Sequence, residues 1–119
     1  MSECKMVSHG EGKFRITAGI HRIGRDTVLL VMGGEKPHAG CVVTCEPDKA
    51  SGSVASSVHS FAGHREEQVA RPIAEAVCRK LKAKVVCICG IHVDNASKGE
   101  IALLVKNTNE LGKRILKCF

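Results

Sequence analysis

Residues 85–97 read VVCICGIHVDNAS, an apolar run that ends abruptly in polar side chains. The first seven of these residues, 85–91, carry no charge, and such a run predicts a strand that is buried on both faces. Three polar side chains follow the strand within four positions, those of His92, Asp94 and Asn95. Ser97 and Glu100 then have the S-x-x-E spacing of a capping box. The stretch therefore predicts a buried strand, a polar loop at its end, and a helix that begins at Ser97.

Four segments before this stretch have the composition of strands. Residues 13–22 alternate apolar and polar side chains, which is typical of a strand with one buried face. The other three segments are 27–32, 41–45 and 53–61. Loops rich in glycine, proline and charge separate them, and short turns between successive strands favour antiparallel pairing in a meander.

Two segments have helical periodicity. Between residues 64 and 82 the apolar side chains fall at helical spacing, at Val69, Ile73, Ala76, Val77 and Leu81. Pro72 lies inside this segment and is expected to kink or restart the helix. The same spacing continues after Ser97 to the end of the chain, through Ile101, Leu104, Val105, Thr108, Leu111, Ile115 and Phe119.

Together these elements predict an α+β fold. We expect a mainly antiparallel sheet of about five to six strands, in the order ββββαβα, with two amphipathic helices on one face. Residues 1–12 are expected to form a flexible lead, and residues 13–119 a single domain.

Composition narrows the classes of partner. The chain has 119 residues and a net charge of +6, which favours anionic ligands. It has three Phe and neither Trp nor Tyr, and its basic residues are dispersed, so nucleic acid is not an expected partner. No apolar run reaches the ~18 residues of a membrane span, so no membrane partner is expected. Most of the seven cysteines lie within apolar segments, which indicates packing in a reducing, cytoplasmic setting.

Chain direction brings three unusual loops to one end of the fold. If consecutive elements alternate in direction, GGEKPHAG (33–40), FAGHREE (61–67) and GIHVDNAS (90–97) lie at the same end of the sheet. Each loop carries one histidine, and these are His38, His64 and His92. Both helices are expected to begin at this end, where helix N-termini favour anions and Lys36 and Arg65 add positive charge. The combination predicts a site for a small molecule that carries a phosphate.

The same residues allow other interpretations. Gly33 and Gly34 can serve only a turn, and Asp94 or Asn95 can form an Asx turn before Ser97. The three histidines with Asp94 could hold zinc in a hydrolase, although no HxH or HExxH spacing is present. A thiol-dependent enzyme is a weaker alternative, because the cysteine nearest these loops is Cys41, which lies at the edge of one of them. The loops could also dock a protein partner without any small molecule.

Taken in order, GGEKPHAG, GHREEQVARPIAEAV and VCICGIHVDNASKGEI resemble the prenylated-flavin chaperone family (LpdD type), which is encoded beside UbiD-like decarboxylases. The resemblance extends from Phe14 to Leu116. It implies a non-enzymatic chaperone that binds reduced prenylated flavin mononucleotide (FMN) as cargo. The chaperone would deliver it to an apo UbiD-like decarboxylase of the gallate or hydroxybenzoate type. It also implies a homodimer similar to small proteasome-assembly chaperones, with the flavin prenyltransferase as a further partner.

The resemblance also implies which residues bind the cargo. Carried over by motif, the candidate site is Gly33, Gly34, Lys36, His38, Gly63, His64, Arg65, His92, Asp94 and Asn95. No catalytic residue and no metal ligand is implied. Ala39 stands where the family typically has a larger apolar residue. Since Trp and Tyr are absent, the flavin ring would rest on aliphatic, glycine or imidazole surfaces.

Overall fold

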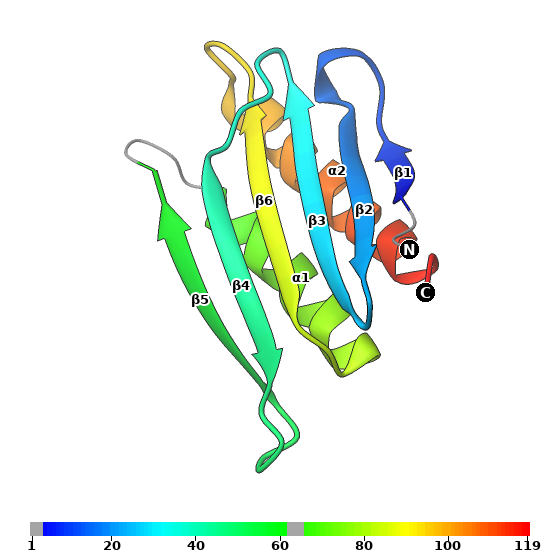
Figure 1. Cartoon of the computed structure of the whole chain (residues 1–119). Coiled ribbons are helices and arrows are strands. Elements are labelled where there is room, and N and C mark those ends of the chain that lie inside the picture. The colour runs from blue at the N-terminus through cyan, green and yellow to red at the C-terminus, as the bar shows by residue number, and fades with distance from the viewer. Residues whose placement is uncertain (1–3, 62–65) are drawn as a thin grey trace.

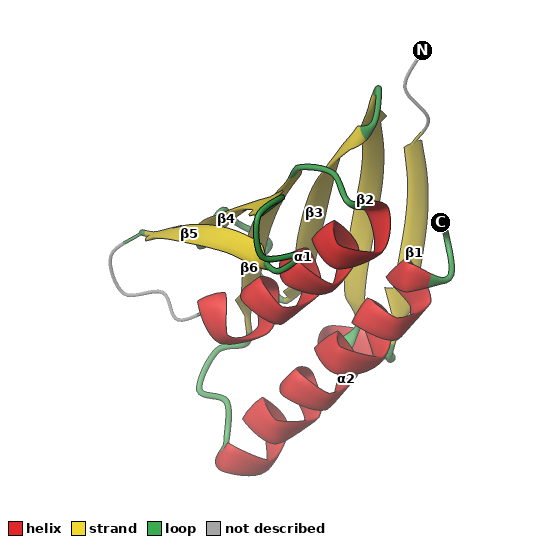
Figure 2. Cartoon of the chain, turned by 90° about the horizontal axis from the view of Figure 1, so that it is seen from below, coloured by secondary structure: helices red, strands yellow, loops and turns green. Residues whose placement is uncertain are grey.

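Both helices lie on one face of a six-stranded sheet, as Figures 1 and 2 show from two directions. The structure is a computed structural model that describes residues 4–61 and 66–119. The strands are β1 (Cys4–His9), β2 (Ile16–Ile23), β3 (Asp26–Gly34), β4 (Cys41–Pro47), β5 (Val54–Ser60) and β6 (Val85–His92). The helices are the short 3-10 helix η1 (Gly12–Phe14), α1 (Glu67–Leu81) and α2 (Lys98–Leu116).

The predicted α+β fold with a sheet of five to six strands is confirmed, and the sixth strand lies at the start of the chain. The expectation of a flexible lead over residues 1–12 is wrong for Cys4–His9, because this segment forms the edge strand β1, paired antiparallel with β2. Val7 packs against the core, whereas Met6 on the other face is 63% exposed. A single inward apolar side chain is too weak a pattern to predict a strand from the sequence. The strand forms because its backbone pairs with that of β2.

The strand order corrects the expected meander. The order across the sheet is β1-β2-β3-β6-β4-β5, so β6 lies between β3 and β4 (Figure 1). β6 pairs parallel with β3 and antiparallel with β4. A strand that is apolar on both faces gains most in the middle of a sheet, where both of its edges are also paired. The chain between β3 and β4 must therefore pass over the end of β6.

The core fills the space between the sheet and the helices. Leu29 and Val31 of β3 and Cys87 of β6 pack there with Val77 of α1 and Leu111 of α2, and all five are at most 1% exposed. Side chains alternate along a strand, so the intervening residues of β3 and β6 lie on the sheet face that carries no helix. We call this the open face.

The helices follow the sequence prediction closely. α1 runs without interruption from Glu67 to Leu81, so the expected restart at Pro72 does not occur. The capping box at the start of α2 is present: Glu100 N–H donates to Ser97 Oγ (3.1 Å), and Ser97 N–H donates to Glu100 Oε1 (3.0 Å). Within the described ranges, neither helix is long and apolar enough to cross a membrane.

Candidate functional site

The segment that joins β3 to β4, residues 35–40, crosses the end of β6, and we call it the crossing loop. Backbone hydrogen bonds tie both of its ends to β6: Glu35 N–H donates to the carbonyl of His92 (2.7 Å), and Gly40 N–H donates to that of Cys89 (2.9 Å). A side chain on Gly90 would overlap the carbonyl of His38. The close crossing therefore depends on a glycine in β6.

A second glycine shapes the entry to the crossing loop. Gly34 has φ +80°, a conformation that glycine adopts without steric cost. A side chain at this position would also overlap the carbonyl of His92. Gly34, one of the three glycines that the sequence placed in the site, thus serves the close approach of two backbones at its edge.

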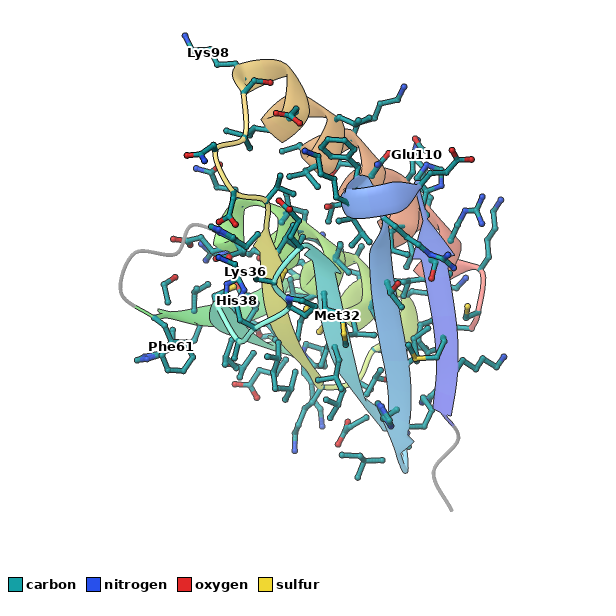
Figure 3. All side chains as sticks on the ribbon, turned by 90° about the horizontal axis from the view of Figure 1, so that it is seen from above. Met32, Lys36, His38, Phe61, Lys98 and Glu110 are labelled. Atoms are coloured by element: carbon teal, nitrogen blue, oxygen red, sulfur yellow. The ribbon has the colours of Figure 1, made fainter. Side chains whose placement is uncertain are left out.

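The crossing brings together polar side chains from distant parts of the chain. The rings of His38 and His92 meet edge to face, with centroids 6.3 Å apart. Lys36 Nζ lies 3.1 Å from Asp94 Oδ2, and His92 Nε2 lies 2.8 Å from Asp94 Oδ1. Figure 3 shows Lys36 and His38 next to each other at this end of the sheet. We call Lys36, His38, His92 and Asp94 the polar cluster.

The start of α1 joins the polar cluster through Glu66. His38 Nε2 lies 3.1 Å from Glu66 Oε1, and His38 Nδ1 lies 2.8 Å from the carbonyl oxygen of Lys36. The Glu66 side chain is only 10% exposed. Its carboxylate lies against Gly40, where an added side chain atom would come within 2.6 Å of it. A third glycine thus permits helix and crossing loop to pack closely.

Charges in the polar cluster are balanced rather than uniformly positive. The imidazole of His92, and next the ammonium group of Lys36, hold the pKa of Asp94 below its ordinary value. Glu35 adds a further carboxylate, whose Oε1 accepts the N–H of Asp94 (3.0 Å). The Lys36 side chain is 66% exposed, and ion pairs in such settings are weak enough to be exchanged for another anion.

The start of α2 lies apart from the polar cluster, although the sequence placed both helix N-termini at one site. At the start of α2, Ser97 Oγ accepts the N–H of Glu100, and Lys13 pairs with Glu100 at 3.4 Å. Lys98, the first residue of α2, lies well away from Lys36 and His38 in Figure 3. The start of α1 does lie beside the polar cluster.

The remaining candidates have different positions. Gly33 faces the helices, where an added Cβ would lie 2.6 Å from Ile16 Cδ1, so its role is packing of β3 against β2. Asn95 has φ +52° and lies in the turn before α2. Three candidates lie outside the described residues, namely Gly63, His64 and Arg65.

Sequence reasoning missed several neighbours of the polar cluster. Glu35 and Glu66 were not candidates, because lone carboxylates beside loops carry no distinctive pattern. Phe61 was also missed: it is 46% exposed, meets the ring of His59 edge to face at 5.1 Å, and donates its N–H to the carbonyl of Gly40. Its place directly after a strand that ends at the candidate site was the available signal.

An apolar hollow of about 240 Å³ adjoins the polar cluster on the open face. It is lined by Leu30, Met32, Pro37, His38, Ala39 and Ile88. Pro37, His38 and Ala39 of the crossing loop contribute one part of the lining, and aliphatic side chains of β3 and β6 contribute the other. Two larger hollows, of about 380 and 640 Å³, lie at the opposite end of the sheet around the β4–β5 turn and have no histidine in their lining.

The described residues give little support to metal or thiol chemistry. Among residues 4–61 and 66–119, no group of three or more His, Cys, Asp and Glu side chains is placed to hold a metal ion. Both ring nitrogens of His38 already contact oxygens. Burial, and next the charge of Glu66, raise the pKa of the Cys41 thiol to about 11, so it is not a ready nucleophile.

Comparison with a solved structure agrees with this architecture. The chain is similar to a chain of a chaperone complex for yeast 20S proteasome assembly, with a TM-score of 0.65 over 98% of this chain and 94% of that one. The sequences are only 11% identical, so the likeness concerns the fold alone.

Comparison with known sequences identifies a family. Protein LpdD of Lactiplantibacillus plantarum is 27% identical over 103 residues, which cover 87% of this chain and 76% of that protein. Residues 10–119 match the family model described as the prenylated flavin chaperone LpdD-like domain. The match includes β2 to α2, the crossing loop and the polar cluster. The chain therefore belongs to the family of LpdD-like prenylated flavin chaperones.

Proposed function

We propose that this protein binds reduced prenylated FMN as cargo at the crossing loop and delivers it to an apo UbiD-like decarboxylase. The observation that carries the proposal is the crossing of residues 35–40 over β6, which sets Lys36, His38 and His92 beside an apolar hollow. The family match supports the nature of the cargo. The recipient enzyme is inferred from the resemblance of the three loops.

Different parts of the site suit different parts of such a ligand. A flavin mononucleotide has an anionic phosphate, a ring edge with hydrogen-bonding groups, and apolar ring surface. Lys36 is the exposed cation of the polar cluster, and the imidazoles of His38 and His92 offer flat ring surface. Arg65, which precedes α1 in the sequence, is proposed as a second cation for the phosphate, together with His64 and Gly63.

The openness of the site suits a carrier. His92 and Asp94 have side chains 46% and 48% exposed, so a ligand here would remain partly in contact with solvent. Affinity differences between related complexes arise mainly in the dissociation rate, and a shallow site permits the fast release that delivery requires. We therefore propose a non-enzymatic role, in which the protein holds the cargo and passes it on.

We further propose the setting in which this occurs. The protein would act in the cytoplasm as a homodimer, receiving cargo from the flavin prenyltransferase and passing it to the decarboxylase. The dimer would resemble the small proteasome-assembly chaperones whose fold it shares. Sedimentation of the purified chain at micromolar concentration would test the homodimer.

The test of the proposed function is an anaerobic titration followed by transfer. The purified protein is titrated with reduced prenylated FMN, and saturable binding of one ligand per chain is expected. The loaded protein is then mixed with apo-decarboxylase, and cofactor transfer is followed by separating the two proteins. Replacing Lys36 by Met should weaken binding about tenfold, whereas Lys49→Met, at the opposite end of the sheet, should not change it. Absence of saturable binding to the wild-type protein would refute the proposal.

A further inference from the structure

We propose that the apolar hollow beside His38 binds the isoprenoid unit of the ligand, and that this hollow makes the protein select prenylated over ordinary reduced FMN. The inference rests on the proposed function and assigns the part of the site that recognises the prenyl-derived group. Five carbons distinguish a prenylated flavin from its parent, and they carry no charge.

The lining of the hollow is almost entirely apolar. Leu30 and Met32 of β3 and Ile88 of β6 lie on the open face, and all three are partly buried. Pro37 and Ala39 of the crossing loop cover one side. Water forms no hydrogen bonds with an apolar surface. An apolar group that displaces this water is stabilised in proportion to the surface area that it covers.

The size of the hollow matches the group. Its volume is about 240 Å³. Five carbon atoms, each needing roughly the 30 Å³ of a liquid water molecule, would fit within it. A whole tricyclic flavin ring would not, so the ring must extend out of the hollow toward the polar cluster.

The position of the hollow fixes the orientation of the ligand. His38 belongs both to the hollow and to the polar cluster, and its ring lies 6.3 Å from that of His92. A ligand with its apolar unit beneath Pro37 and Ala39 would present its polar edge to the imidazoles. The two subsites thus require a molecule in which an isoprenoid unit adjoins a polar ring.

The magnitude of the expected selectivity follows from the burial of methylene groups. Each fully buried methylene changes a binding constant about fourfold. If about half of the isoprenoid unit is covered, reduced prenylated FMN should bind roughly 30-fold more tightly than reduced FMN.

The experiment compares both ligands with three variants under anaerobic conditions. Met32→Gln and Leu30→Gln each place a polar group in the hollow. Both should reduce the 30-fold preference to threefold or less, without changing the affinity for reduced FMN more than threefold. Val28→Thr is the matched control, because Val28 lies on the same face of β3 outside the hollow, and it should keep the preference.

The outcomes separate the two proposals. If the wild-type protein binds the prenylated ligand and both hollow variants keep its preference, the assignment of the hollow is wrong and the proposed function stands. If the wild-type protein binds neither ligand, the proposed function itself is wrong. A measurement on the wild-type protein does not depend on the folding of variants: methyl NMR signals of Leu30, Met32 and Ile88 should shift with reduced prenylated FMN and much less with reduced FMN. Equal shifts with both ligands would overturn the assignment.

Discussion

The carbonyl group of His38 lies directly against the α-carbon of Gly90, where the crossing loop passes over β6. The contact joins the crossing loop to β6 and permits β6 to sit between β3 and β4 while the chain still connects these two strands. It also sets the height of His38 above the sheet, and hence its approach to His92. Backbone packing at a single glycine thus connects the strand order to the geometry of the candidate site.

Replacing Gly90 by Ala should therefore lower the free energy of unfolding and disturb the geometry of the candidate site. The added methyl group would overlap the His38 carbonyl, and backbone is less able to move aside than a side chain. Overpacking of this kind costs about 1–3 kcal/mol of unfolding free energy. Urea unfolding would measure it, and ligand binding should weaken as the crossing loop moves.

Gly99→Ala is the matched control, because the neighbouring side chain of Ser97 comes no nearer to the new methyl group than its Oγ, at 3.9 Å. This helical position should be neutral or gain up to about 1 kcal/mol. Equal stability of Gly90→Ala and the wild-type protein would contradict the close crossing of the two backbones.

The pKa of Asp94 should depend on its two basic neighbours. In the folded chain this pKa lies below the ordinary value of 3.8, with His92 the larger cause and Lys36 the next. The ionised carboxylate and its contacts therefore persist above pH 3.8 and are lost as the pH falls through the lowered pKa. His92→Gln should raise the pKa of Asp94 toward 3.8, and Lys36→Met should raise it by less.

An NMR titration of the Asp94 carboxyl carbon would measure these values. Asp48 serves as internal control, because hydrogen bonds from Ala50 and Ser51 lower its pKa and neither substitution touches them. A pKa of Asp94 that stays the same in both variants would argue against the contacts of the polar cluster.

The buried cysteines should be inert while the protein is folded. Burial raises the pKa of Cys45 to about 11 and that of Cys87 to about 12, and it also raises the pKa of Cys89. Iodoacetamide at pH 8 should modify half-buried Cys118 at least tenfold faster than these three thiols, because the thiolate is the reactive form. Mass spectrometry of peptides from native and urea-unfolded protein would give the rates. If Cys41 were modified as fast as Cys118 in the folded protein, the result would support the alternative hypothesis of a thiol-based activity.

Asn107 should stabilise the fold without contributing to the site. Its side chain is buried, and Nδ2 donates to the carbonyl of Phe14 (2.9 Å), which ties η1 to α2. Asn107→Ala would leave the carbonyl of Phe14 without this donor, at a cost of about 1–3 kcal/mol. Asn109→Ala, an exposed position two residues further along α2, should change the unfolding free energy by less than about 0.5 kcal/mol. If urea unfolding gave the two variants the same stability, the hydrogen bond to Phe14 would not stabilise the fold.

Local patterns in the sequence were sufficient for most elements and for part of the site. The apolar run at 85–91 and the capping box at Ser97 predicted β6 and α2, because both signals lie within a few neighbouring residues. Alternating chain direction predicted that the loops carrying His38 and His92 would meet, and their rings are 6.3 Å apart.

The pairing of strands that lie far apart in the chain could not be predicted from the sequence. Nothing local states that β6 inserts between β3 and β4, since an apolar strand can occupy any central position. Gly90 falls within the predicted strand 85–91, and no local signal indicates that another chain segment crosses the strand there. The apolar hollow was missed for the same reason: Leu30, Ile88 and Ala39 come from three segments, and only the strand order brings them together.

The central claim is that the crossing loop and the end of β6 form the binding site, and ligand-induced NMR shifts test it most directly. The uniformly ¹⁵N-labelled protein would be titrated anaerobically with reduced prenylated FMN, and backbone amide shifts recorded. We expect the largest changes at residues 34–40 and 90–95, and little change in the turn at residues 48–53. Changes confined to that turn, around the hollow of about 380 Å³ at the opposite end of the sheet, would contradict the account.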